Sequence, residues 1–267
     1  MSIIVSVIIN DGIVMAADSA TTFANGQIYE GANKLVNLVK GVPVGVMTCG
    51  CGGLGTASIA TLLKDLRQRL AGKDTAHADW QLDLEKYTVE GLAGRVREFL
   101  IEKSEGIDLK GCFLMLRICG YSSGRPQPEM WQVACVDAEW SGPTCVQPEG
   151  EFGPRWEGEP EALNRLILGL GTIPEAGVAA LGMNAKQVQE ASGKLIPHTY
   201  ETLIMWAAPI QDAIDLARFM VETTKGFIRF AVTRRKTVGG PVEIATITKH
   251  EGFRWVQRKL FYPADLN

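Results

Sequence analysis

The first seventeen residues contain two apolar runs separated by a short polar turn. Ile3 to Ile9 is continuous and largely β-branched, the turn residues Asn10, Asp11 and Gly12 follow, and Ile13 to Ala17 is apolar again. Two such runs around turn-forming residues predict a β-hairpin. Since both strands are apolar on both faces, we expect a sheet that is covered on each side rather than one that faces water.

Apolar runs of strand length recur along the chain, and amphipathic helical periods interrupt them in four places. The predicted strands after the first hairpin lie at 27–28, 34–39, 42–48, 112–121, 130–137, 143–147, 242–248 and 253–260. The predicted helices lie at 56–70, 88–103, 159–168 and 209–224. This order of strands, two helices, strands, two helices and strands predicts an α+β fold, a four-layer αββα sandwich formed as a single domain by residues 1–267.

Composition narrows the class of protein. The chain has 267 residues, of which 46% are hydrophobic and 21% charged, as in ordinary globular proteins. A formal net charge of −3, without runs of Lys or Arg, gives no reason to expect nucleic acid or an anionic membrane as a partner. No apolar run approaches the roughly 20 residues that cross a bilayer, so we expect a soluble cytoplasmic protein.

Metal and cofactor chemistry find little support in the sequence. Six cysteines are thinly spread, and the three histidines are isolated from one another, so no zinc-binding constellation is present. The stretch GCGGLG at 50–55 matches a dinucleotide-binding motif, but two successive helices follow it instead of a repeating βαβ series. A tight glycine turn fits better, and such a turn can also direct backbone N–H groups into a site as an oxyanion hole.

Four stretches together resemble the landmarks of proteasome β-type subunits, which are N-terminal-nucleophile hydrolases. They are GIVMAADSATT, GANKLVNL, GVMTCGCGG and VGGPVEIATIT, and the resemblance is strongest over residues 1–70 and the last sixty. Family members use the first residue of the mature chain as nucleophile, with an aspartate sixteen residues on and a lysine thirty-two on. Counting from Ser2 gives Asp18 and Lys34.

The resemblance implies a catalytic role for each of these residues. Ser2, exposed by removal of Met1, would attack a carbonyl while its own α-amine, with an unperturbed pKa of about 7.7 to 8.0, acts as base. Lys34 would supply positive charge, Asp18 would hold Lys34, and the N–H of Gly50 would be the oxyanion donor. Taken singly, Asp18 could be a turn-forming residue and Lys34 a solvated strand-edge lysine.

The resemblance also implies a substrate site. Thr22 matches the position whose backbone receives the substrate as an added strand. Ala32, Val36 and Met47 would line the first specificity pocket, and their apolar character favours hydrophobic side chains there.

Three positions depart from the family pattern. In the turn RWEGEPEAL, Glu157 stands where active family members carry a serine. In the later stretch TRRKTVGGP, Arg235 and Val238 stand where those members carry the aspartate and the serine that orient the terminal amine. Two hypotheses of different class therefore remain, a peptidase that works with serine and a ring-forming scaffold without peptidase activity. A third is hydrolysis of small-molecule amides, which the superfamily also supports.

Partners follow from the resemblance alone. It implies a homo-oligomer of stacked rings that degrades peptides or unfolded proteins, an unfoldase as a possible partner, and no cofactor. The segment 171–209 is longer than the usual connection between the last two helices, and we interpret it as an insertion that reshapes the ring surface or entrance.

Overall fold

Two five-stranded antiparallel sheets form the centre of the molecule in a computed structural model that describes residues 2–23 and 26–259. The first sheet has the order β12 (Gly153–Gly158), β1 (Ile3–Ile9), β2 (Gly12–Ala17), β13 (Glu243–Thr248) and β14 (Gly252–Gln257). The second has the order β11 (Glu139–Gln147), β10 (Glu129–Val136), β9 (Phe113–Gly120), β6 (Val44–Gly50) and β5 (Leu35–Asn37). Two small hairpins, β3 (Thr21–Thr22) with β4 (Ile28–Tyr29) and β7 (Gly53–Leu54) with β8 (Ala57–Ser58), lie beside them.

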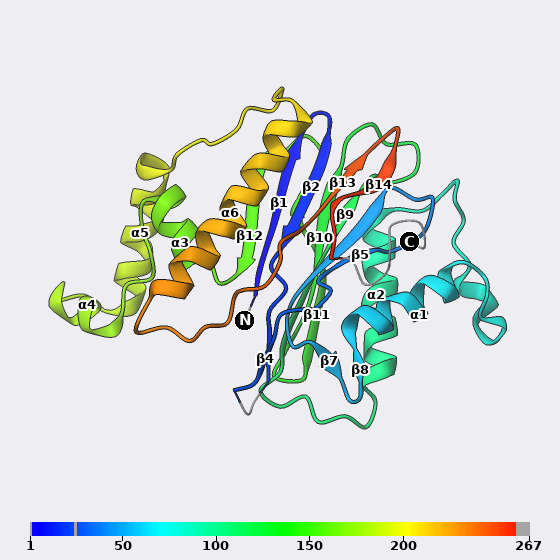
Figure 1. Cartoon of the computed structure of the whole chain (residues 1–267), viewed down its shortest axis with the longest axis horizontal. Helices are drawn as coiled ribbons and strands as arrows, with labels where there is room; N and C mark the ends of the chain where they lie inside the picture. Colours follow the sequence, from blue (N-terminus) through cyan, green and yellow to red (C-terminus); the bar gives the residue numbers. More distant parts are fainter. Residues whose placement is uncertain (1, 24–25, 260–267) are drawn as a thin grey trace.

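Helices cover the outer face of each sheet, as Figure 1 shows. On the first sheet α6 (Ile210–Phe230) packs on β1 and β2, together with the short α3 (Glu161–Leu163). On the second sheet α2 (Val89–Ser104) packs on β10 and β11, and α1 (Ile59–Leu70) lies beside β5. The predicted four-layer αββα arrangement is confirmed.

Three apolar clusters correspond to the three interfaces between these layers. One joins α1 and α2 to the second sheet, one joins α3 and α6 to the first sheet, and the third lies between the two sheets. All residues of β1 and β2 are buried, because α6 covers one face of the hairpin and the second sheet covers the other. This accounts for the absence of polar alternation in the first hairpin.

The main difference from the predicted elements is β12, an edge strand that pairs with β1 and was predicted as part of a turn. Its half-exposed sequence GPRWEG lacks an apolar run, so the pattern gave no strand signal. The helix predicted from position 56 begins only at Ile59, because Ser58 caps it by accepting from Thr61 N–H. The helix predicted at 159–168 is α3 followed by one wider turn at Asn164–Leu168. The last strand ends at Gln257, and position 260 of its predicted range lies outside the described residues.

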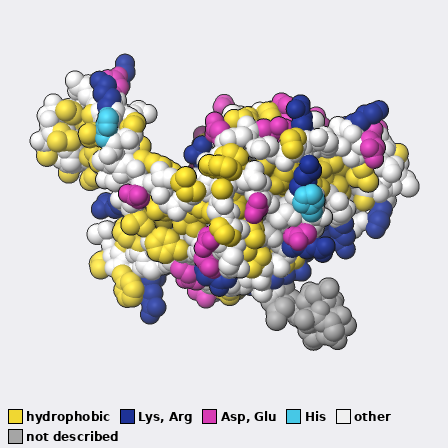
Figure 2. All heavy atoms as spheres, turned by 90° about the horizontal axis from the view of Figure 1, so that it is seen from above, with side chains coloured by type: hydrophobic (Ala, Val, Ile, Leu, Met, Phe, Trp, Pro, Cys, Tyr) yellow, Lys and Arg dark blue, Asp and Glu magenta, His cyan; other side chains and the backbone are white. Residues whose placement is uncertain are grey.

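The segment 171–209 forms two further helices, α4 (Glu175–Ala180) and α5 (Ala185–Thr199), before the chain enters α6. Figure 2 shows a lobe on the left of the molecule, on the side where Figure 1 places these helices. Leu181, Met183 and Leu195 are between 42% and 55% exposed on it.

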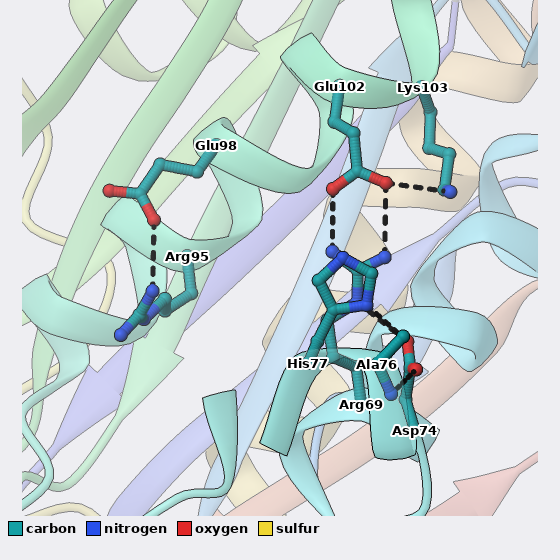
Figure 3. A network of polar contacts seen from close by, with 8 residues as sticks. All are labelled: Arg69, Asp74, Ala76, His77, Arg95, Glu98, Glu102 and Lys103. Carbon is teal, nitrogen blue, oxygen red and sulfur yellow. Dashed lines mark hydrogen bonds and ion pairs between the residues drawn. The ribbon is translucent and has the colours of Figure 1, made fainter. Parts of the chain in front are cut away.

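A charged network ties α1 to α2 on the opposite side of the molecule (Figure 3). The guanidinium of Arg69 donates to both carboxylate oxygens of Glu102, at 2.6 and 3.0 Å, and contacts Asp74 at 3.2 Å. Its planar face lies 4.8 Å from the ring centroid of Trp80 and 4.9 Å from that of Phe99. Bidentate, stacked contacts of this kind fix the angle between two helices.

Candidate active site

The first hairpin brings Asp18 back to the start of the chain. In the register of β1 and β2, Ile4 lies opposite Ala17, and Asp18 N–H donates to the carbonyl of Ile3 at 3.2 Å. The fifteen residues between Ser2 and Asp18 are thus two strands and one tight turn, which is the geometry that the hydrophobic pattern predicted.

Asp18 is fully buried and accepts four hydrogen bonds. Its Oδ1 accepts from Ile3 N–H at 2.9 Å and from Lys34 Nζ at 2.6 Å. Its Oδ2 accepts from the N–H groups of Ala20 at 3.1 Å and Gly239 at 3.0 Å. One carboxylate therefore clamps the start of β1, the lysine, and a segment that lies more than 200 residues away in the sequence.

Lys34 is the basic partner of this carboxylate, and its side chain is only 6% exposed. Burial lowers the pKa of the Lys34 amine, and the carboxylate of Asp18 opposes that shift. The two groups form a buried ion pair whose hydrogen bonds are satisfied, rather than a solvated lysine at a strand edge.

A cleft of about 630 Å³ opens in front of this ion pair. It is lined by five of the residues predicted for the site, namely Ser2, Thr22, Ala32, Lys34 and Gly50, while Asp18 lies behind them. Ser2 is 4% exposed, and its carbonyl accepts a hydrogen bond from Glu159 N–H at 2.8 Å. Met1, whose removal was predicted, lies outside the described residues.

Gly50 directs its N–H group towards the cleft. Gly50 lies opposite Leu114 in the pairing of β6 with β9, and the next residue, Cys51, donates its N–H to Phe113 O at 2.7 Å. Gly50 and Leu114 are therefore a non-hydrogen-bonded pair of the ladder. The N–H of Gly50 thus points away from β9, to the side of β6 on which Lys34 lies. With φ at +98° and the carbonyl of Phe113 in the space that a Cβ would need, only glycine fits here.

Two backbone segments form the walls of the cleft. Thr21 and Thr22 lie in β3, whose pairing within the described residues is with β4. The opposite wall is the glycine-rich segment that includes Gly52. A Cβ added to Gly52 would lie 3.0 Å from Thr21 Oγ1, so the two walls approach closely at that point. An extended chain of backbone width can run between such walls.

Val36 and Met47, which were predicted to line the specificity pocket, do not line this cleft. Val36 packs in the cluster beneath α1 and α2, and Met47 packs between the two sheets. Because side chains alternate along a strand, the neighbour of Met47, Thr48, faces the cleft instead. Sequence reasoning missed Thr48 because the resemblance pointed to its neighbour Met47, whose side chain faces the other side of the strand.

Glu157 lies in β12, opposite Ile4, and is paired with a buried arginine. Arg117 of β9 donates to its carboxylate at 2.5 Å, and burial lowers the pKa of the Arg117 guanidinium. Burial, together with the carboxylate of Glu157, also raises the pKa of the Cys49 thiol to about 12. The signal for this pair in the sequence is a single arginine within the apolar run FLMLRICG.

Arg235 and Val238 contribute no polar contact to the site within the described part of the chain. The side chain of Arg235 is exposed, and Val238 packs in the apolar cluster beneath α6. Thr237 is buried, and its hydroxyl has no hydrogen-bond partner among the described residues. In those same residues, no group of three or more His, Cys, Asp or Glu side chains could hold a metal ion.

Comparisons with known proteins place the fold. No protein-family model and no curated protein sequence matches the chain. Among solved structures, it is similar to Anbu, an ancestral β-subunit, from Yersinia bercovieri, with a TM-score of 0.52 and 13% identity over 96% of this chain and 88% of that one. Between positions 2 and 259, excluding 24 and 25, no helix is long and apolar enough to cross a bilayer. The chain has a proteasome β-subunit-like fold, with two antiparallel sheets flanked by helices.

Proposed function

We propose that this protein is an N-terminal-nucleophile hydrolase that cleaves peptide bonds through Ser2 after Met1 is removed. The observation that carries the proposal is the meeting of Ser2, Lys34 and Gly50 in one cleft, with Asp18 buried behind the lysine. Asp18 accepts a hydrogen bond from Lys34 Nζ and one from the N–H of Ile3, the residue after Ser2, so it links the lysine to the start of the chain.

Each group has a role in the proposed reaction. The free α-amine of Ser2 takes the hydroxyl proton, and Oγ attacks the substrate carbonyl. The N–H of Gly50 stabilises the oxyanion, and the amine then protonates the leaving group, which leaves an ester on Ser2. Water attacks that ester, again with the amine as base, and releases the acid. Lys34 favours the deprotonated amine by its positive charge, and Asp18 holds Lys34 in place.

Substrate binding would use the two backbone walls. An extended peptide pairs with the free edge of β3 at Thr22, and its scissile carbonyl lies near Gly50. Ala32 and Thr48 contribute to the side-chain pocket, which is therefore less apolar than the sequence alone predicted.

A specific observation favours a second candidate, a ring-forming scaffold without peptidase activity. Val238 is buried and apolar, and Arg235 points to solvent, so neither can orient the terminal amine. Serine also lacks the methyl group that restricts the χ1 of threonine, so the nucleophile is less well preorganised. If the protein is a peptidase despite these differences, we expect slow acylation of Ser2, whereas the scaffold predicts none.

Assembly into stacked rings is part of the proposal. It rests on the fold shared with an ancestral β-subunit, and the lobe formed by α4 and α5 would then shape the ring surface or entrance. Sedimentation of the purified chain tests it, because a monomer at micromolar concentration would contradict the ring. Deletion of 171–209 with unchanged particle size and activity would contradict the role of the lobe.

Intact mass spectrometry tests the catalytic proposal directly. The purified protein is weighed before and after exposure to a peptide epoxyketone, which needs both a free α-amine and a hydroxyl, and to a β-lactone. We expect a mass that begins at Ser2 and a single adduct with either reagent. Ser2→Ala should give none, whereas Ser6→Ala, a buried serine in the adjoining strand β1, should label normally.

Three results would contradict cleavage of peptide bonds by Ser2. A retained Met1, or a free Ser2 that never labels, would reject the peptidase and favour the scaffold. Labelling by the lactone together with hydrolysis of short acyl amides, but not of peptides, would favour the small-molecule amidase.

A further inference from the structure

A second buried ion pair lies beside the first. Lys259, just beyond β14, is 2.8 Å from the carboxylate of Glu243 at the start of β13, and the two side chains are 8% and 1% exposed. Glu243 lies opposite Ala17 in the sheet, one residue before Asp18. Four charged side chains, two acidic and two basic, thus share one buried region.

Lys259 also joins the two segments that carry the predicted catalytic pair. Its Nζ donates to Ser19 Oγ at 2.8 Å and to the carbonyl of Ala32 at 2.8 Å. Ala32 N–H in turn donates to the carbonyl of Ser19 at 2.9 Å. The amine therefore fixes the residue after Asp18 against the wall of the cleft that leads to Lys34.

The charge of Lys259 acts on the protonation of Lys34. Burial lowers the pKa of both amines, and the positive charge of Lys259 lowers that of Lys34 further. Besides Lys259, the groups that act most on one or other of the two amines in the described part of the chain are Asp18, Glu243, Cys49 and Arg258. Glu243 and Asp18 oppose the loss of charge from Lys259, so the region stays close to neutral as a whole.

We propose that Lys259 is a positioning residue for the Ser2 site, with Glu243 as its buried counterion. It holds the buried Ser19 and the cleft-lining Ala32 in register with the Asp18–Lys34 pair, and its charge tunes the lysine next to the nucleophile. The inference rests on the proposed function, but its electrostatic part can be measured without any activity.

The variant must separate the proposed role of Lys259 from the damage caused by an unpaired buried charge. A buried ion pair contributes little net stability compared with apolar groups of similar size, whereas removal of one partner leaves an uncompensated charge. The informative variant is therefore Lys259→Met combined with Glu243→Gln, which removes both charges together. Lys249→Met, an exposed lysine on the β13–β14 turn, is the matched control.

The first measurement is a titration of the Lys34 amine by NMR of ¹³Cε-labelled lysine, with Lys34→Arg used for assignment. We expect the pKa of Lys34 to rise in the double variant, because Lys259 lowers that pKa and Glu243 is not among the main groups that shift it. Lys249→Met should leave it unchanged. An unchanged titration in the folded double variant overturns the electrostatic part.

The second measurement is the rate of Ser2 acylation by the β-lactone as a function of pH and concentration. We expect the limiting rate to fall about tenfold, short of the roughly hundredfold loss that a misplacement of about 1 Å can cause, with little change in half-saturation. A limiting rate equal to that of the parent protein overturns the positioning role. If the parent protein never labels, the proposed function is rejected instead. The NMR titration then still tests whether the charge of Lys259 shifts the pKa of Lys34.

Discussion

Replacement of Asp18 by Asn tests the centre of the site, because the substitution keeps the shape of the side chain and removes its charge. The amide NH₂ must face one of two donor pairs, either Ile3 N–H with Lys34 Nζ or the N–H groups of Ala20 and Gly239. Loss of one partner from a buried ion pair costs about 3–5 kcal/mol, and donors left unsatisfied cost about 1–3 kcal/mol. We therefore expect a loss of at least about 4 kcal/mol of unfolding free energy.

Guanidinium unfolding at pH 7 measures this loss. With an m-value of roughly 2–6 kcal/mol per molar, the midpoint should fall by at least about 0.7 M. Combination with Lys34→Met, which removes the stranded charge, should recover about half of the loss. Asp11→Asn, an exposed residue in the β1–β2 turn, is the matched control. The reasoning is refuted if Asp18→Asn costs less than about 1 kcal/mol, or if the double variant is no more stable than the single one.

Three further predictions concern the rest of the molecule. The hydrogen bonds from Arg69 hold the pKa of Glu102 at about 2, below its ordinary value near 4.5. The stability from this contact is full above the ordinary pKa and is lost as pH falls towards 2, so Arg69→Met should flatten acid unfolding over that window by about 1 kcal/mol, as for partly exposed pairs. Gly50→Ala should destabilise the fold by about 2 kcal/mol and abolish acylation of Ser2, because the added Cβ would collide with the carbonyl of Phe113. A wild-type value for the stability or for the acylation would contradict the positive φ of Gly50 and its place at the cleft. The Sγ atoms of Cys51 and Cys112 lie 2.9 Å apart, so diamide should join them in a disulfide that peptide mapping locates, and crosslinks elsewhere would contradict this geometry.

The parts of the site that follow from local pattern could be predicted from the sequence. Asp18 reaches the chain start because two uninterrupted strands and one tight turn leave it no other place. The fold class could also be predicted, because the order of strands and helices follows from the local pattern of apolar residues. Periods of two and 3.6 residues are local properties, and they record which face of an element is buried.

The parts that depend on register or distance could not be predicted. A slip of one residue exchanges Met47 for Thr48 at the cleft, because neighbouring side chains on a strand face opposite ways. The partner of Glu157, Arg117, comes from a different sheet, and Lys259 reaches Ser19 across 240 positions of sequence. No periodicity reports such contacts.

The same long-range contacts bear on how a serine nucleophile without amine-orienting side chains could act. Preorganisation that Val238 and Arg235 do not supply must come from elsewhere, and the groups in place to supply it are the Asp18 clamp and the amine of Lys259. Both connect the segment that follows the first hairpin to residues that flank the last one, namely Gly239 before β13 and Lys259 after β14. The geometry around Ser2 should therefore depend on the C-terminal hairpin as strongly as on the residues beside it in sequence. On this argument, a chain whose last hairpin is loosened loses acylation before it loses its fold, whereas the scaffold alternative predicts no acylation at any stage.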